Sequence, residues 1–355
     1  MIQPLTSVSG PQSPSFYGLS REELTQRLRE RGMPSYRAAQ LFSWVYRRHQ
    51  REPARMTNLP AALRRGLDGV CDLALPQASV LETADRQTHK FVLFLPDGAR
   101  VECVSMRTPR RLTLCLSSQV GCALKCSFCA TGLMGLKRNL LPGEIVAQVV
   151  AMGDFHHWRD ERFNLVFMGM GEPLANYGAV LAAIRILHDP YGLNLGVRRI
   201  TVSTSGLVPQ IRELAGERMP LGLAVSLHAT TDALRDQLVP VNRRWPIREL
   251  LVAARDYGRE TGRRVTLEYT LLAGVNDGPE DAERLAEFAR ELPSKINLIP
   301  YNPVPGLPWE RPSPERVQEF ADRLLPRAPA VTVRNTLGGE IWAACGQLGG
   351  LSPQS

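Results

Sequence analysis

One stretch of the chain reads Cys122-Ala-Leu-Lys-Cys126-Ser-Phe-Cys129, with an aromatic residue directly before the last cysteine. Three thiolates at this spacing can bind three irons of a four-iron cluster and leave the fourth iron without a protein ligand. Clusters that only transfer electrons are usually ligated by four cysteines. In zinc proteins, likewise, an open coordination position distinguishes catalytic from structural sites. The stretch therefore predicts chemistry at a metal cluster, beyond the storage of electrons.

A structural zinc site is the main alternative for these cysteines. Zinc commonly takes four ligands from paired cysteine or histidine elements, and the sequence has no second pair nearby. Structural disulfides are disfavoured, because an odd number of cysteines, seven in all, is most simply explained by a reduced cytoplasmic setting. The cluster interpretation is therefore preferred.

The composition is typical of a globular protein with one barrel-sized domain and an appendage. The 355 residues are 44% hydrophobic, which is sufficient for a sizeable core. No apolar run approaches the length of a membrane span, so no association with a membrane is expected. Residues 1–15 lack the pattern of a signal peptide and are expected to form a disordered tail. The net charge of +8 favours a polyanionic partner, usually a nucleic acid.

Residues 16–75 have the pattern of a basic helical module. Eleven arginines outnumber six acidic residues there, and aromatic residues lie among them. Helices are expected to begin near Ser20, Ser35 and Pro60, with a capping-box pattern at the first of these positions. The aromatic side chains are expected to be buried. The arginines suit either a solvated helix face or contacts with RNA phosphates, and the sequence leaves both interpretations open.

The remainder of the chain predicts an α/β fold. Residues 76–110 alternate as two strands around the turn Pro96-Asp97-Gly98, which indicates a β-hairpin linker. Between residues 111 and 348 strands alternate with helices, as in a partial (β/α)6 barrel with parallel strands, and a short tail is expected at 349–355. The expected strands are 112–116, 164–168, 199–203, 221–227, 266–271 and 295–300, and the expected helices are 142–153, 176–188, 207–216, 246–262 and 278–292. A final helix at 313–325 and a strand at 330–334 are also expected.

Polar segments follow several of these strands, at the edge where βα barrels bind their ligands. The cysteine triplet follows the first strand. Gly169-Met-Gly-Glu-Pro173 follows the second, and its Glu172 offers a carboxylate to an ammonium group. Each segment alone is more often a turn or a helix cap, but together they predict a binding site. The other three segments are Ser203-Thr-Ser-Gly206, Ser226-Leu-His228 and Tyr301-Asn302.

These motifs resemble those of the radical S-adenosylmethionine (SAM) superfamily. More narrowly, the segments 117–129, 226–228, 275–277, 296–300 and 343–348 are similar to those of the RlmN/Cfr family of RNA methyltransferases. The resemblance implies a [4Fe-4S] cluster held by Cys122, Cys126 and Cys129, with SAM chelating the open iron. It also implies further contacts with SAM, at Gly171, Glu172, Ser203, Ser226, Leu227, His228 and Asn302.

The resemblance gives roles to three more residues. In the implied route, Cys345 carries a methyl group taken from one SAM, and a radical derived from a second SAM activates that methyl for addition to carbon 2 of adenine. Glu102 then accepts the ring proton. Cys115 attacks the sulfur of Cys345, which releases the methylated RNA and leaves a transient disulfide. Without the resemblance, Glu102 would be interpreted as a polar strand residue, Cys345 as a loop thiol and Cys115 as a buried apolar residue.

The implied substrates are adenosines of 23S rRNA and of tRNA, and an external electron donor is required. A monomer is expected. One segment departs from the family, because many relatives have Arg-Gly-Asp-Asp-Ile where this chain has Leu337-Gly-Gly-Glu-Ile341. Within the family, the run Gly171-Glu-Pro-Leu174 favours carbon 2, because the enzymes that methylate carbon 8 tend to have alanine after that glutamate, and methylation at carbon 8 stays an alternative.

Two further alternatives concern the substrate and the need for catalysis. The first is a radical SAM enzyme that acts on something other than RNA, and the basic module and the pair of Cys115 and Cys345 argue against it. The second is a non-catalytic, metal-stabilised RNA-binding protein. That protein would have four closed metal ligands and no need of Cys345.

Overall fold

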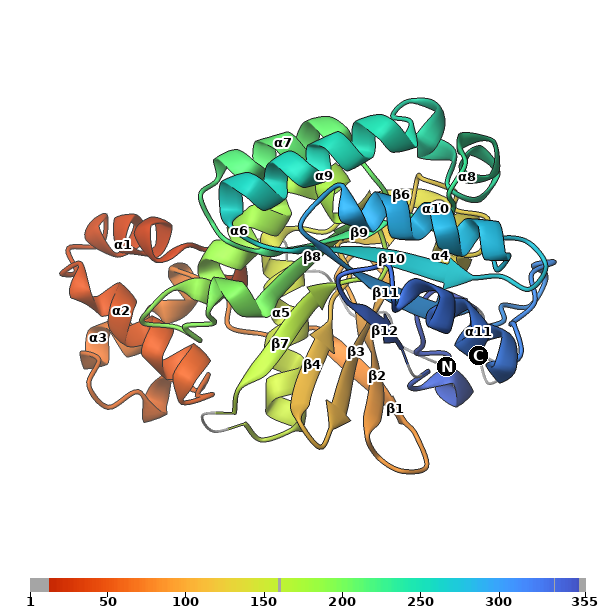
Figure 1. Cartoon of the computed structure of the whole chain (residues 1–355). Coiled ribbons are helices and arrows are strands. Elements are labelled where there is room, and N and C mark those ends of the chain that lie inside the picture. Colours follow the sequence, from red (N-terminus) through yellow and green to blue (C-terminus); the bar gives the residue numbers. More distant parts are fainter. Residues whose placement is uncertain (1–12, 159–160, 335, 351–355) are drawn as a thin grey trace. The chain divides into compact units, whose positions relative to one another are not determined.

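The computed structural model describes residues 13–158, 161–334 and 336–350. The chain divides into two compact units (Figure 1). The first contains the chain up to Leu75 together with Leu141–Asp160 and Ala182–Asn194, and the second contains Pro76–Leu140, Glu161–Leu181 and the chain from Leu195 onward. The first unit therefore includes the expected helical module and two segments between residues 111 and 348. Most of the expected tail at 1–15 lies outside the described residues, as does most of that at 349–355.

The first unit is helical. Its α-helices are α1 (Arg21–Arg29), α2 (Tyr36–Phe42), α3 (Ala61–Arg65) and α5 (Pro142–Phe155), and α2 continues into a π-helical turn at Ser43–Arg47. The predicted capping box is confirmed, because the Ser20 side chain accepts the Glu23 amide and the Glu23 carboxylate accepts the Ser20 amide. Ser35 precedes α2 as expected, but its side chain makes no capping hydrogen bond.

Aromatic rings form the core of the first unit. Phe16, Phe42 and Tyr46 have ring centroids 5.2–5.5 Å apart, and none of the three is more than 1% exposed. The predicted burial of the aromatic residues is thus confirmed. Several arginines bind groups of the same unit: Arg51 pairs with Asp154, and Arg21 pairs with Asp189 at 2.8 Å. These contacts hold together segments of the first unit that are distant in the sequence.

A ten-stranded sheet forms the centre of the second unit (Figure 1). β1–β4 pair antiparallel, whereas β4 and the strands that follow it in the sheet pair parallel, in the order β4-β7-β8-β9-β10-β11-β12. The expected hairpin is therefore an extension of the barrel sheet. The strands are β1 (Gln77–Glu82), β2 (Thr88–Phe94), β3 (Arg100–Thr108), β4 (Arg111–Cys115), β7 (Phe163–Phe167), β8 (Ile200–Thr204), β9 (Gly222–Ser226), β10 (Val265–Leu271), β11 (Ser294–Pro300) and β12 (Val331–Val333).

Helices connect the parallel strands, as the predicted partial (β/α)6 barrel requires. They are α6 (Tyr177–His188, whose later part belongs to the first unit), α7 (Val208–Gly216), α8 (Asp232–Leu238), α9 (Ile247–Thr261), α10 (Pro279–Arg290) and α11 (Pro314–Leu324). Every residue of β10 is buried, which is typical of a parallel strand covered on both faces. The predicted fold is confirmed. Among the strands and α-helices, those not predicted are β1, the short helix α4 (Ala130–Leu133), α8, and the two strands of a small sheet, β5 (Gln119–Gly121) and β6 (Leu136–Asn139).

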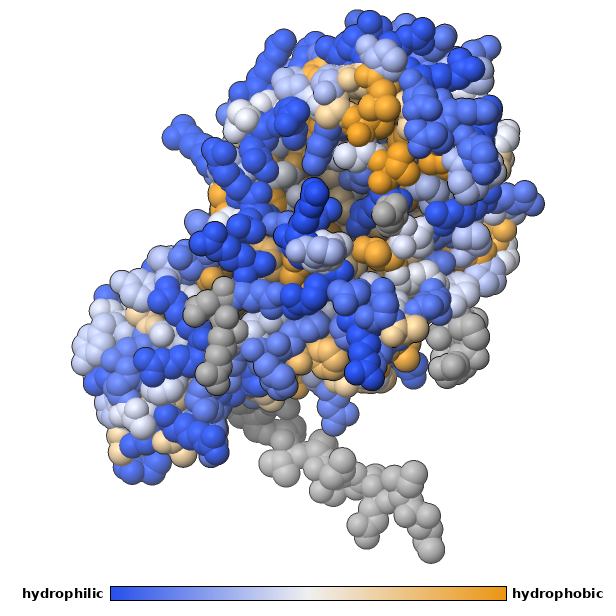
Figure 2. All heavy atoms as spheres, turned by 60° about the horizontal axis from the view of Figure 1, so that its bottom comes forward, coloured by the Kyte–Doolittle hydropathy of each residue, from blue (hydrophilic) through white to orange (hydrophobic). Residues whose placement is uncertain are grey.

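The surface is mainly polar. On the face in Figure 2 hydrophilic residues predominate, and hydrophobic residues gather only in small patches. In the described part of the chain, no helix combines the length and the apolar character needed to cross a membrane.

Candidate active site

An open cavity of about 970 Å³ lies at the carboxyl ends of the parallel strands. Parallel strands bring the loops that follow them to one edge, so segments far apart in the sequence meet there. The predicted site residues that line it are Cys122, Cys126, Cys129, Gly171, Glu172, Ser203, Ser226, His228, Asn302 and Cys345.

The cysteine loop has a fixed backbone path. The Cys122 amide donates to the carbonyl of Gly135 at 3.0 Å, and a Cβ on Gly121 would lie 1.8 Å from that same oxygen. Only glycine fits at position 121, where φ is also +80°. The amide of Ala130 donates to the carbonyl of Gly346 at 2.8 Å. This bond joins the end of the cysteine loop to the segment that carries Cys345.

The three thiols fit an iron–sulfur cluster. Burial raises the pKa of Cys122 to about 11 and also raises the pKa values of Cys126 and Cys129, and the proximity of the thiols to one another adds to this effect. Bound iron would supply the positive charge that makes thiolates favourable in such a place. Among the described residues no three histidine, cysteine or acidic side chains converge as they would on a single metal ion.

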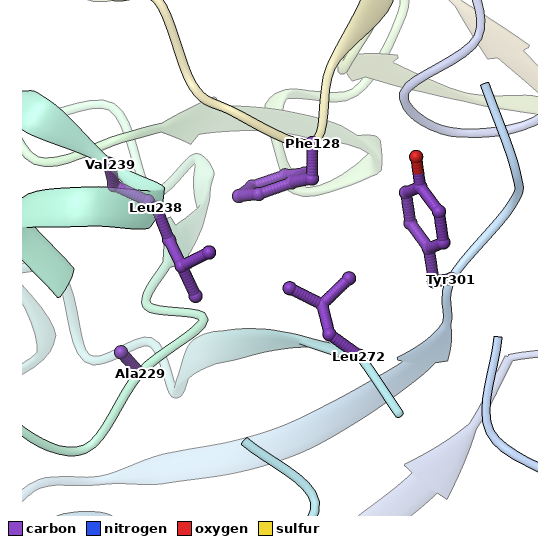
Figure 3. Packing of buried hydrophobic residues seen from close by; sticks show 6 residues of the cluster. All are labelled: Phe128, Ala229, Leu238, Val239, Leu272 and Tyr301. Carbon is purple, nitrogen blue, oxygen red and sulfur yellow. The ribbon is translucent and has the colours of Figure 1, made fainter. Parts of the chain in front are cut away.

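Phe128 explains the aromatic position of the cysteine motif. Its ring belongs to a buried hydrophobic cluster with Ala229, Leu238, Val239, Leu272 and Tyr301 (Figure 3). Cys126 and Cys129 pack against this cluster. The aromatic ring therefore anchors the loop on the barrel and leaves the two flanking thiols at the cavity.

Glu172 is held by backbone amides. One carboxylate oxygen accepts the amide of Leu174 at 3.1 Å and the other accepts the amide of Ser205 at 2.8 Å. The carboxyl group is buried, and burial raises its pKa to about 7. A Cβ on Gly171 would lie 2.5 Å from the Cβ of Gln119, so the close approach before Glu172 requires glycine. A carboxylate fixed in this way is suited to bind a cation in the cavity.

His228 presents a defined tautomer. Its Nδ1 accepts the amide of Thr270 at 2.9 Å, which leaves the proton on Nε2. Burial, followed by the charge of Arg235, lowers the pKa of His228 to about 3. The neutral ring therefore offers one N–H donor. Asn276 fixes the backbone at this point by donating to the carbonyl of His228 at 2.8 Å.

Arg235 was not predicted as a site residue. Its side chain binds backbone carbonyls at the ends of β8 and β9. Its guanidinium donates to the carbonyls of Ser205 at 2.7 Å, Ser226 at 3.0 Å and Leu227 at 3.0 Å. Arg235 contacts Leu227 through the backbone carbonyl of that residue. The Leu227 side chain is fully buried and does not line the cavity. An arginine in a short polar helix gives no sequence signal of such a role.

Glu268 and Arg334 also line the cavity and were not predicted. Burial raises the pKa of Glu268, and its carboxylate accepts a hydrogen bond from Asn297 at 2.6 Å. A glutamate within the otherwise apolar strand β10 was the available signal for this residue.

A second cavity of about 460 Å³ contains the other predicted thiol. Cys115 and Cys345 both line it, so Cys345 belongs to both cavities. Both thiols are free in this structure. Burial, with a further contribution from Cys345, raises the pKa of Cys115 to about 12, and Arg334 acts in the opposite direction. Leu337, at the position where many relatives have arginine, is also part of the wall of this cavity.

Glu102 does not line either of these cavities. One of its oxygens accepts the amide of Gly349 at 3.0 Å, and the other lies 3.7 Å from the ammonium of Lys90. Lys90 is 1% exposed, and its Nζ lies 3.5 Å from the carbonyl oxygen of Trp342. The pair thus binds the chain on both sides of Cys345.

Two family models match the chain. The model of the radical SAM superfamily matches residues 116–289, and that of the ribosomal RNA large subunit methyltransferase N-terminal domain matches residues 15–73. These two stretches correspond to the barrel and to the basic helical module.

Full-length relatives carry the same name. A probable dual-specificity RNA methyltransferase RlmN of Symbiobacterium thermophilum is 50% identical, over 93% of this chain and 90% of that protein. A dual-specificity RNA methyltransferase RlmN of an Anaeromyxobacter species is 48% identical, over 94% of this chain and 90% of that protein.

A solved structure agrees with these relatives. A radical SAM methyltransferase from Sphaerobacter thermophilus superposes with a TM-score of 0.90 at 50% identity, over 94% of this chain and 98% of that one. Such extended similarity to enzymes leaves no support for a non-catalytic RNA-binding protein. With the cysteine motif, the barrel and the N-terminal module all matched, the chain belongs to the RlmN family of radical SAM methyltransferases.

Proposed function

We propose that the chain methylates carbon 2 of adenosine in 23S rRNA and in tRNA, through a methyl group carried on Cys345. The double specificity follows the name of its relatives. The observation that carries the proposal is the position of Cys345 in both cavities. A methyl carrier must meet the methyl donor and later a resolving thiol, and this side chain reaches the walls of both sites.

In the first cavity, Cys122, Cys126 and Cys129 would hold the cluster. The bound cluster supplies the electron with which SAM is cleaved. Glu172 would bind the ammonium of SAM, and the Nε2–H of His228 would donate to an acceptor atom of SAM. Gly171, Ser203, Ser226 and Leu227 would provide the remaining contacts, with Leu227 acting through its backbone, and Asn302 would contact SAM from the loop after β11.

In the second cavity, Cys115 would resolve the covalent intermediate. Its thiolate would attack the sulfur of Cys345, so that the bond from that sulfur to the transferred carbon breaks and a disulfide forms between the two cysteines. Arg334 lines both cavities, and its charge favours the thiolate form of Cys115 in a place where burial disfavours it. An external thiol or dithiol would then reduce the disulfide.

Glu102 would accept the proton that leaves the adenine ring. The Gly349 amide and the Lys90 ammonium fix the direction of its carboxylate, and the carboxylate keeps further lone pairs for a proton. The hydrogen bond from the Gly349 amide also ties Glu102, on β3, to the segment that carries Cys345. Acceptor and methyl carrier are thereby held together.

The basic module would contact RNA. Arg29, Arg48 and Arg65 are exposed, and in the described part of the chain their side chains form no ion pair or hydrogen bond. We therefore assign residues 16–75 as an RNA-binding accessory domain, 76–110 as the hairpin linker and 111–348 as the catalytic core. A monomer in the reduced cytoplasm, with an external electron donor, completes the proposal.

Mass spectrometry of cellular RNA tests the reaction. Ribosomal and transfer RNA are compared between cells with and without the gene, and complementation with Cys345→Ala is compared with Cys71→Ala, a buried cysteine of the first unit. We expect 2-methyladenosine in both RNA classes to disappear without the gene and to return only with Cys71→Ala. A mark at carbon 8 would support the alternative regiochemistry, and unchanged RNA would contradict the proposal.

The purified protein tests the cluster separately. Anaerobically purified protein should be brown and contain about four irons per chain, as expected for a four-iron cluster. Replacement of any one cysteine of the triplet should reduce this content. A colourless protein that contains zinc would rule out the enzyme as proposed.

A further inference from the structure

Arg235 on α8 is a fully buried cation next to a predicted cluster ligand. Its side chain is 0% exposed, and the four hydrogen bonds that it forms with the described residues go to neutral oxygens. Three of these are backbone carbonyls, and the fourth is Oδ1 of Asn242 at 2.9 Å. A buried charge is usually paired with an opposite charge, because burial without such a partner is unfavourable. We therefore expect a negatively charged group close to this guanidinium.

Asp232 and Asp236 do not bind the guanidinium directly. Both carboxylates accept hydrogen bonds from the Nδ2 group of Asn242, at 3.0 and 2.7 Å. Asn242 is 1% exposed and therefore separates the guanidinium from these acids. Burial lowers the pKa of Arg235 to about 10, against the influence of Cys126 and then of the two acids, so the side chain stays charged at neutral pH.

Ser205 connects the guanidinium to the cysteine motif. Its carbonyl accepts Nη2 of Arg235 at 2.7 Å, and its Oγ lies 3.9 Å from Sγ of Cys126. Its amide also donates to Glu172, so one residue contacts a cation, a predicted iron ligand and a predicted SAM ligand. The thiolate of Cys126 in a bound cluster is thus the negative group that the buried cation lacks.

We propose that Arg235 is a positioning residue whose buried charge balances that of the cluster and raises the reduction potential of the cluster. The proposal rests on cluster ligation by Cys122, Cys126 and Cys129, as proposed above. Reduction adds one negative charge to a cluster that already carries three thiolates. A fixed cation in a poorly solvated place stabilises the reduced form more than the oxidised form. The enzyme needs the reduced form to begin its reaction.

The test is a redox titration of the loaded enzyme, followed by electron paramagnetic resonance and without added SAM. The variants are Arg235→Met, Arg235→Lys and Arg235→Gln, the last of which removes the charge but keeps an amide that can donate to the carbonyls. Arg284→Met is the matched control, since Arg284 also lies in the second unit and binds Thr230, at 2.9 Å, but pairs with Asp281. Iron content and circular dichroism are recorded for each protein.

We expect Arg235→Met and Arg235→Gln to shift the midpoint to more negative potential. At the wild-type midpoint, their ratio of reduced to oxidised cluster should fall about tenfold, which corresponds to ~59 mV for one electron. Arg235→Lys keeps the charge but loses donors to the carbonyls of Ser205, Ser226 and Leu227. It should therefore retain a midpoint near that of the wild type while binding SAM more weakly. The control should leave the midpoint unchanged.

Equal shifts in the methionine and lysine variants would overturn the proposal, because geometry and not charge would then be the cause. If Arg235→Met does not fold, Arg235→Gln decides the question, and an unchanged midpoint in that variant would overturn the proposal too. A wild-type protein without a cluster would contradict the proposed function itself. The two failures are thus distinguishable.

Discussion

The side-chain amide of Asn302 donates a hydrogen bond of 3.1 Å to the backbone carbonyl of Cys345. Its Oδ1 in turn accepts from Thr336 at 2.9 Å, so the amide orientation is fixed on both sides. Sequence analysis predicted Asn302 as a contact for SAM. In the structure, Asn302 holds the segment that carries Cys345, the proposed methyl carrier.

Replacement of Asn302 by alanine should lower the fraction of methylated Cys345. A lost hydrogen bond of this kind is worth about 1 kcal/mol, so roughly a fivefold decrease in the rate of methylation is expected. Intact-protein mass spectrometry measures the methyl group, and Asn164→Ala, on β7 with a 3.3 Å bond to Arg199, is the control. Normal methylation with weakened SAM binding would limit Asn302 to the cofactor.

Replacement of Cys115 by alanine should trap a protein–RNA adduct through Cys345. The resolving thiol is removed, whereas the cysteines of the cluster motif are untouched. Denaturing gels and mass spectrometry of the purified protein detect the adduct, and Cys103→Ala on the neighbouring strand β3 is a matched buried control. If Cys115→Ala were free of RNA and still released methylated product, its resolving role would be wrong.

Binding of SAM should weaken as the pH falls through about 7. Burial raises the pKa of Glu172 to about 7, so the carboxyl group gains a proton below that pH and no longer attracts an ammonium group. Bound SAM favours the ionised form of Glu172, so the pKa of this carboxyl group is lower in the complex than in the free protein. Calorimetry from pH 6 to pH 8.5 measures the affinity. Glu172→Gln should bind weakly at every pH, and a wild-type affinity independent of pH would exclude this role.

The double variant Arg29→Ala with Arg65→Ala should weaken RNA binding and reduce its dependence on salt. Each lost phosphate contact lowers the slope of log affinity against log salt by about 0.7–0.9. Filter binding with tRNA at several salt concentrations measures the slope, and Arg290→Ala, an exposed arginine at the end of α10, is the control. An unchanged slope would leave these arginines as a solvated surface.

Arg51→Ala should behave differently from these surface variants. Arg51 pairs with Asp154 inside the first unit and is partly buried, so its loss should lower the melting temperature of the protein. Thermal unfolding measured beside the RNA titration separates the two effects.

The positions of the site residues could be predicted because alternating strands and helices force strand ends to one edge. Glu172, Ser203, Ser226 and His228 lie at or just after the carboxyl ends of strands that the sequence indicates clearly, and all four line one cavity. Cys115 and Cys345 have no local signal that relates them. Their connection came from the resemblance to a known family.

Arg235 and Lys90 could not be found from the sequence. Burial of an arginine or a lysine depends on tertiary contacts, and their sequence surroundings resemble those of solvated residues. The helices α4 and α8 were missed because each is too short for a periodic pattern. The grouping of α5 with the N-terminal helices likewise depends on contacts between distant segments.

Two contacts anchor the C-terminal segment that carries Cys345, the proposed methyl carrier. Lys90 binds the chain at Trp342 and Glu102 binds it at Gly349, and only residues 343–348 lie between these points. Cys345 is therefore confined near both cavities at a high effective concentration toward each. As the proposed methyl carrier, Cys345 would meet a bound methyl donor and Cys115 in these two cavities. The order of the two encounters is then decided by which cavity holds a reactant.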